Sequence, residues 1–184
     1  MNPFPNSMDF GGYNAPSRVE CDVYDLIVEG KVPEEISGSW FRSVPDPQYT
    51  PLTGDDTYLS GDGMVSVFQF ENGHVDYRMR YVQTERWKNE RKARRSLYGL
   101  YRNPYTDDPS IQAPGMNHKR GVANTTPVYH GGKLKSQTMT AHTRLDPETG
   151  ELYFFGYEAG GLATRDVSYC VADKEGNLVR EEWF

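Results

Sequence analysis

Four histidines are the residues of this chain that are best suited to catalysis or metal binding: His74, His118, His130 and His142. None belongs to an HExxH or HxH pattern, and the sequence has no CxxC pair, no serine-centred nucleophile elbow and no phosphate-cradling loop. His130 and His142 could approach one another if they end neighbouring strands. Because two neutral imidazoles bind a divalent metal poorly without a third ligand, spacing alone indicates a metal site only weakly.

Two charged segments raise alternative binding functions. Residues 54–63 contain three glycines and three aspartates, and such an acidic loop could bind Ca²⁺. Its spacing is not that of an EF-hand loop, so a tight structural turn is the favoured interpretation. Six of the ten residues from 86 to 95 are Lys or Arg, which could serve an anionic partner. A solvated helix face, offset by acidic loops, is favoured there.

His142 immediately precedes a strongly patterned hairpin within residues 139–157. Asp146-Pro-Glu-Thr-Gly150 has the residues of a chain reversal, because Pro fixes φ, Asp can bond its own backbone and Gly accepts a positive φ. Along residues 152–157 both faces of the second strand are largely apolar, which predicts a strand in the interior of a sheet. We therefore expect a rigid frame to hold His142.

Two further hairpins share this layout of an aromatic strand, a polar turn with Gly and a second strand. One lies in residues 68–81, where Asn72-Gly73 supplies both positive-φ positions of a two-residue turn, and the other lies in residues 169–184. Recurring β units of this kind indicate the blades of a propeller. Together with many aromatic residues, glycines and prolines, they predict an all-β fold.

The remaining segments complete the expected layout. Residues 23–28 resemble a first strand, and residues 84–101 change to a helical period and predict one short helical segment. Residues 1–18, rich in Pro, Gly, Asn and Ser, predict an amino-terminal arm. We expect a partial β-propeller domain over residues 19–184, since 184 residues fall within the size of one domain.

Composition narrows the classes of partner. The net charge of −6 makes general binding to a nucleic-acid backbone unfavourable. Cys21 and Cys170 match no metal or redox spacing and do not describe a disulfide scaffold, which favours a reducing compartment. The amino terminus lacks a basic start followed by an apolar run, and no apolar window reaches the length of a membrane span. A soluble, cytoplasmic protein is expected.

Six short motifs, in family order along residues 16–184, resemble those of the carotenoid cleavage oxygenases, and most closely those of the lignostilbene dioxygenase branch. They are Glu29-Gly-Lys-Val-Pro, Gly61-Asp-Gly-Met-Val, Tyr101-Arg-Asn-Pro-Tyr-Thr-Asp-Asp-Pro, Ala123-Asn-Thr, Thr140-Ala-His142 followed by Asp146-Pro-Glu-Thr-Gly, and Asp173-Lys-Glu-Gly-Asn-Leu-Val-Arg-Glu-Glu-Trp-Phe184. The resemblance implies a seven-bladed β-propeller with axial Fe(II) held by four histidines. It also implies cleavage of an olefinic C=C bond with O₂ to two carbonyl products, on a small hydrophobic or phenolic alkene such as a hydroxystilbene or an apocarotenoid.

The resemblance assigns roles to three residues. His142 matches an iron ligand, the histidine of the family's Ala-His-Pro motif, although Thr143 replaces the proline. Tyr101 and Lys133 match the tyrosine and lysine that contact a phenolic hydroxyl in the lignostilbene branch. Leu59 occupies a place where an aromatic residue often flanks the substrate.

Two departures qualify these implications. Family members are far longer, and the other three iron-binding histidines are expected beyond residue 184. Few residues separate Lys133 from Met139 where the family has further strands, which predicts either a deletion between two similar Gly-Gly-Lys-Leu segments or a missed exon. The chain is therefore expected to be an incomplete, amino-terminal part of such an enzyme. The alternative is a non-catalytic, β-rich module that binds a ligand or another protein.

Overall fold

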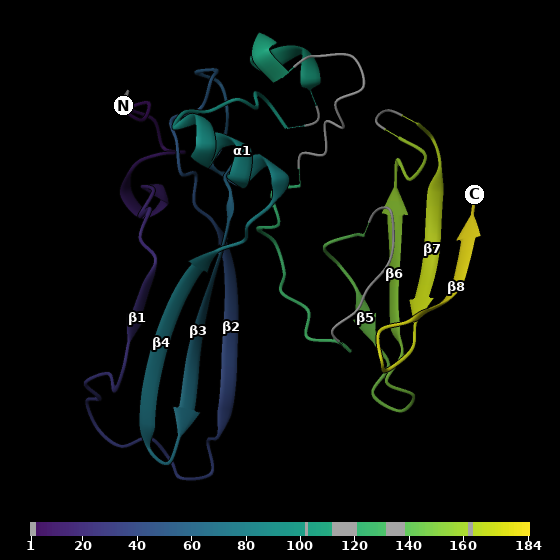
Figure 1. The fold of residues 1–184 in the computed structure, drawn as a ribbon. Coiled ribbons are helices and arrows are strands. Elements are labelled where there is room, and N and C mark those ends of the chain that lie inside the picture. Colours follow the sequence, from purple (N-terminus) through teal and green to yellow (C-terminus); the bar gives the residue numbers. More distant parts are fainter. Residues whose placement is uncertain (1–2, 102, 112–120, 132–138, 162–163) are drawn as a thin grey trace. The chain divides into compact units, whose positions relative to one another are not determined.

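The computed structural model describes residues 3–101, 103–111, 121–131, 139–161 and 164–184. The chain divides into two compact units, Met1–Pro127 and Val128–Phe184. Each unit contains one four-stranded antiparallel sheet, and the described helices are one α-helix and four single-turn 3₁₀ helices (Figure 1). The chain is thus mostly β, as the composition and the hairpin patterns predict. The predicted division at residue 18 stays a prediction.

The sheet of the first unit has the strand order β1-β4-β3-β2. Its strands are β1 (Cys21–Val23), β2 (Gly38–Pro45), β3 (Gly63–Glu71) and β4 (His74–Tyr81). The predicted Asn72-Gly73 turn is confirmed, since both residues have a positive φ, +53° and +82°, and Glu71 pairs with His74 across it. The strand predicted at 23–28 is wrong in extent, because Asp25 adopts φ +54° and turns the chain away after Val23.

One face of this sheet has a row of aromatic side chains. Trp40 lies opposite Phe68, and Phe68 lies opposite Tyr77, with ring centroids 5.8 and 4.8 Å apart. Cross-strand aromatic pairs of this kind each contribute about 0.2–1 kcal/mol to sheet stability. The row fixes the register of three neighbouring strands, and Trp40 on the edge strand remains 53% exposed.

Helix α1 (Glu85–Ala93) follows the sheet, and the prediction of one short helical segment is correct in its start but not in its end. Thr84 caps the helix, because its Oγ1 accepts a hydrogen bond from the Trp87 N–H at 3.1 Å. Arg94 is left-handed, with φ +57°, and ends the helix before the predicted limit of residue 101. The periodic residues beyond it therefore lie in a loop that has its own hydrogen bonds.

The second unit has a sheet in sequential order, β5-β6-β7-β8. Its strands are β5 (Arg144–Leu145), β6 (Leu152–Tyr157), β7 (Val167–Ala172) and β8 (Leu178–Trp183). Both hairpins predicted here are confirmed, and β6 is an interior strand as predicted. One face forms the core from Leu152, Phe154, Cys170 and Ala172, each at most 2% exposed. The opposite face of β6 remains partly open, since Phe155 is 42% exposed.

The 3₁₀ helices are η1 (Gly12–Asn14), η2 (Tyr58–Ser60), η3 (Pro104–Thr106) and η4 (Pro109–Ile111). The amino-terminal residues are held to the first unit by the buried carboxylate of Asp46, which accepts hydrogen bonds from the backbone N–H groups of Ser17 and Arg18. Among the described residues, no helix is both long enough and apolar enough to cross a membrane.

Candidate functional site

His142 is held by the backbone of the second unit, directly before β5. Two residues earlier, the N–H of Thr140 donates to the carbonyl of Phe155 on β6 at 2.7 Å. The Thr140 side chain then accepts from the backbone N–H of His142 at 3.2 Å. The His142 side chain is exposed. Its backbone thus has a defined place beside an interior strand.

The hairpin after His142 owes its shape to local turn chemistry. The Asp146 carboxylate accepts from the backbone N–H of Glu148 at 2.8 Å, and Gly150, at φ +73°, donates its N–H to the Asp146 carbonyl at 2.8 Å. The first of these bonds is the main reason that the pKa of Asp146 lies below its usual value. All the participants lie within five residues, so this frame is determined by adjacent sequence.

The other histidine described in this unit has a different role. His130 Nε2 donates to the carbonyl oxygen of Asp173 at 2.6 Å, on the turn that joins β7 to β8. The nitrogen therefore stabilises a turn instead of remaining available to a metal. His74, in the first unit, pairs through Nδ1 with Asp25 at 2.8 Å.

The described residues do not form a complete iron site on their own. Within them no group of three or more His, Cys, Asp or Glu side chains is placed to hold a metal ion. Among the described histidines, His142 is the one that the resemblance assigns as a ligand, whereas the resemblance implies four. His118 and Lys133 lie outside the described residues.

Tyr101, in the first unit, follows four residues whose successive backbone N–H groups all donate to side chains. Glu90 Oε1 accepts from Leu97 and Tyr98, at 2.9 and 3.1 Å. Asp107 then accepts from Gly99 at 2.7 Å, and Thr106 Oγ1 accepts from Leu100 at 2.7 Å. These hydrogen bonds fix the backbone directly before Tyr101. The Tyr101 side chain is 45% exposed and thus accessible to a ligand. We name residues 97–101 the tyrosine segment.

Leu59 projects from η2, within the acidic loop where the sequence predicts a turn. Its side chain is 60% exposed, although its backbone is firmly held. Asn124 Nδ2 donates to the carbonyls of Leu59 and Gly61, at 2.7 and 2.9 Å. Arg86 Nη1 donates to the Ser60 carbonyl at 2.6 Å. We name residues 57–61 the leucine turn. These residues form a tight turn, as predicted.

A buried group of charges beside these two segments was missed by sequence reasoning. Arg86 is one of the six basic residues interpreted as a solvated face, but its side chain is only 5% exposed. It lies 3.4 Å from Glu90 and 3.7 Å from Asp62. Burial is the main cause that raises the pKa of both carboxyl groups, and the guanidinium opposes it. The spacing of Arg86 and Glu90, one helical turn apart, was the available signal.

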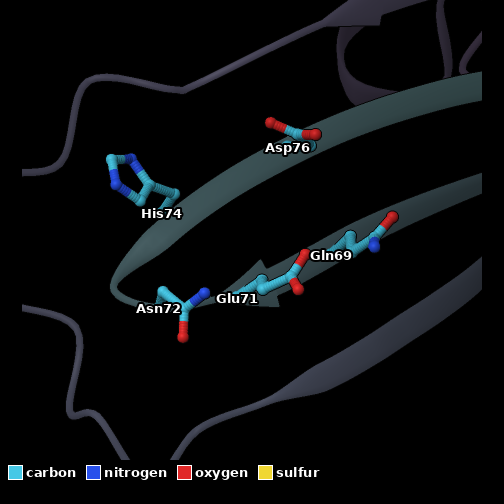
Figure 2. Close-up of a pocket in the computed structure, with 5 residues that line it drawn as sticks. All are labelled: Gln69, Glu71, Asn72, His74 and Asp76. Atoms are coloured by element: carbon cyan, nitrogen blue, oxygen red, sulfur yellow. The ribbon is translucent and has the colours of Figure 1, made fainter.

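Two surface cavities of the first unit are lined by residues other than the predicted site residues. One, of about 170 Å³, lies at the tip of the β3–β4 hairpin, where Figure 2 shows Glu71, Asn72, His74 and Asp76 around it. The other, of about 370 Å³, lies against the aromatic row of the same sheet. Neither is lined by Tyr101 or His142.

Comparisons with known proteins place this mostly β chain in an enzyme class. It superposes on a lignostilbene dioxygenase of Pseudomonas brassicacearum with a TM-score of 0.89 and 38% identity, covering 100% of this chain and 44% of that one. It is 43% identical over 213 residues to lignostilbene-alpha,beta-dioxygenase isozyme III of Sphingomonas paucimobilis, covering 100% of this chain and 43% of that protein. With isoeugenol monooxygenase of Pseudomonas nitroreducens it shares 42% identity, covering 97% and 42%.

A family model described as retinal pigment epithelial membrane protein matches residues 14–138 and 132–184. The chain belongs to this family, that of the carotenoid cleavage oxygenases, which its motifs resemble. It spans less than half the length of the relatives it matches.

The same comparisons bear on the junction near Lys133. The two stretches matched by the family model overlap at residues 132–138, so this short segment is equivalent to two places in the family. The alignment with the Sphingomonas enzyme extends over 213 residues although the chain has 184. The overlap is what a deletion between two similar segments leaves behind, and the deletion stays a prediction.

Proposed function

We propose that this chain is part of an oxygenase that cleaves the C=C bond of a phenolic alkene with O₂ and releases two carbonyl products. The observation that carries the proposal is the match to a lignostilbene dioxygenase over the whole chain, at 43% identity. Lignostilbene and isoeugenol both have a phenol conjugated to a carbon–carbon double bond. A hydroxystilbene or a related phenylpropenoid is therefore the proposed substrate class, ahead of an apocarotenoid.

Tyr101 is proposed to bind the phenolic hydroxyl of this substrate, together with Lys133. A phenol oxygen can both donate and accept a hydrogen bond, and a nearby ammonium group stabilises its ionised form. The phenolate in turn releases electron density toward the conjugated double bond, which favours attack by O₂. The half-exposed Tyr101 side chain, on a backbone fixed by Glu90, Asp107 and Thr106, suits this role.

His142 is proposed as one ligand of the iron that the family resemblance implies. Fe(II), where it is bound, supplies the activation of O₂. His142 supplies only one of the four ligands that the resemblance implies, so the remaining ligands must come from residues beyond those described. A partial seven-bladed propeller and a cytoplasmic location belong to the same proposal.

The alternative is a binding module without catalysis. Its basis is that, among the described residues, no group of three or more His, Cys, Asp or Glu side chains is placed to hold a metal ion. Such a module keeps Tyr101 and holds no iron tightly.

The test is to express the chain with any coding sequence that adjoins it in the gene. Bound iron and O₂-dependent aldehyde release from a 4-hydroxystilbene are then measured. Both are expected, and Tyr101→Phe should lower kcat/KM about tenfold or more through the lost hydrogen bond. Tyr105→Phe is the matched control, since Tyr105 is four residues away and 93% exposed. Binding of the stilbene without iron or cleavage favours the module, and absence of all three contradicts both functions.

A further inference from the structure

The buried Arg86–Glu90 pair lies within a single helix, α1. Arg86 Nε lies 3.4 Å from Glu90 Oε2, and the side chains are 5% and 1% exposed. Removing two charges from water costs several kcal/mol for each ion, and their attraction often does no more than offset that cost. Net stability is therefore a weak reason for such a pair, and its other contacts indicate what it does.

Arg86 reaches from α1 to the leucine turn. Its Nη1 donates to the Ser60 carbonyl at 2.6 Å, the shortest of the hydrogen bonds that hold this turn. Asn124 holds the carbonyls on either side of Ser60, and Asp9 accepts from the Tyr58 N–H at 3.1 Å. Because four backbone groups are held by remote side chains, the turn has little freedom to move.

Glu90 reaches from the same helix to the tyrosine segment. The oxygen that does not face Arg86, Oε1, accepts from the N–H groups of both Leu97 and Tyr98. These are charge-assisted hydrogen bonds, about twice as strong as neutral ones. They direct the chain after Arg94 back along the helix instead of onward as a further helical turn.

Asp62 adds a second negative charge to the group. Its Oδ1 lies 3.7 Å from Arg86 Nε, and its Oδ2 accepts from the Gln48 N–H at 3.2 Å. One guanidinium thus faces two carboxylates, and its hydrogen-bonding directions are set by both. Arg86 has a single orientation, in which it points to the Ser60 carbonyl.

We infer that the Arg86–Glu90 pair is a positioning device, which holds the leucine turn and the tyrosine segment in one fixed relation. The inference rests on the proposed function, because it makes phenol recognition by Tyr101 depend on a pair of charges that does not touch the substrate. Arg86 sets one segment and Glu90 the other, and their ion pair joins the two. Loss of either charge therefore loosens both segments.

Amide hydrogen exchange of the 184-residue chain tests directly whether the Arg86–Glu90 pair holds both segments. Arg86→Met and Glu90→Gln, which keep side-chain volume, should each speed exchange of amides in residues 57–61 and 97–100 about tenfold or more. Arg86→Lys should restore part of the protection. Lys92→Met, which removes an exposed charge from the same helix, is the matched control and should change neither segment. Faster exchange throughout β3 and β4, or in only one of the two segments, overturns the inference.

The second measurement is the preference of the chain for a phenol over its methyl ether. A merely structural role of the Arg86–Glu90 pair would leave this preference unchanged. The ratio of the Kd values for 4-methoxystilbene and 4-hydroxystilbene should fall about tenfold in Arg86→Met and Glu90→Gln and remain unchanged in Lys92→Met. Equal weakening of both ligands overturns the inference. If the unaltered chain has no preference for the phenol, the proposed role of Tyr101 fails, and hydrogen exchange still decides whether the pair holds the two segments. Glu90→Gln, which keeps an acceptor oxygen, serves where Arg86→Met does not fold.

Discussion

Tyr101 and His142, the two described candidate site residues, differ in how the surrounding chain holds them in place. His142 is followed by a hairpin whose turn bonds join residues at most five apart, with Asp146 accepting two of them. Tyr101 follows a loop that is held by a buried glutamate on a helix and, through Arg86, is joined to a turn near residue 60. Local turn chemistry shapes the hairpin in the first case, whereas the second depends on charges that only folding brings together.

Glu90→Ala is expected to have the largest effect on this comparison. It removes the nearer of the two carboxylates that the buried Arg86 faces, and with it the acceptor of two N–H groups, so the free energy of unfolding of the first unit should fall by about 3–5 kcal/mol. Urea denaturation followed by the fluorescence of Trp40 and Trp87 measures it. Glu85→Ala in the first turn of α1 is the control, with an expected loss of about 1 kcal/mol or less. Equal losses in the two variants would show that the buried pair has no special part in the fold.

Gly99→Ala should have an intermediate effect, confined to the tyrosine segment. An added Cβ at Gly99 would lie 2.2 Å from the carbonyl oxygen of Thr106, so the backbone must shift, at an expected cost of about 1–3 kcal/mol. Thermal unfolding measures the loss, and selectivity for 4-hydroxystilbene should fall with it. Gly121→Ala is the matched control, since open space surrounds an added Cβ there. An unchanged midpoint in Gly99→Ala would mean that the close packing around Tyr101 is not required.

The smallest expected effects are opposite responses of two hairpin turns to pH. Asp25 raises the pKa of His74 above its ordinary value, through a hydrogen bond first and its charge second. That contribution to stability is complete below about pH 6.5 and is lost as the pH rises through the folded-state pKa. The pKa of Asp146 is lowered, so its contribution is complete above about pH 4 and is lost as the pH falls.

Thermal midpoints of the chain measured across pH 3–9 test this pair of responses. His74→Gln should remove the decline on the alkaline side only, and Asp146→Asn should flatten the decline on the acid side only. Each variant is the control for the other, because both turns are exposed. A parallel change in the two profiles would contradict the independence of the turns.

Much of the β structure could be predicted because it depends on neighbouring residues. Asn72-Gly73 takes up two positive φ angles with little strain, and Asp146 bonds its own backbone two residues on, so both hairpins follow from short motifs. The apolar residues on both faces of β6 correctly indicated an interior strand. The helix was predicted too long because its period continues past Arg94, while the carboxylate of Glu90 redirects the backbone.

The candidate site could be predicted only as single residues. The motifs around Tyr101 and His142, and the resemblance they carry, were sufficient to identify the family. They did not indicate that His130 would bond to the Asp173 carbonyl, because the two residues are 43 positions apart. Their assigned roles stay predictions, and Lys133 lies outside the described residues.

The sequence by itself determined the turns, the hairpins that they connect and the family of the chain, since these depend on local backbone preferences and on motif order. Only the tertiary structure decided that Arg86 is buried, that Glu90 holds the tyrosine segment and that both act with Asp62. The physical reason is that the position of a charged residue in the sequence does not show which groups surround its side chain after folding. A position on a helix predicts a solvated face, and only the packing of remote segments around it determines whether the charge remains in water.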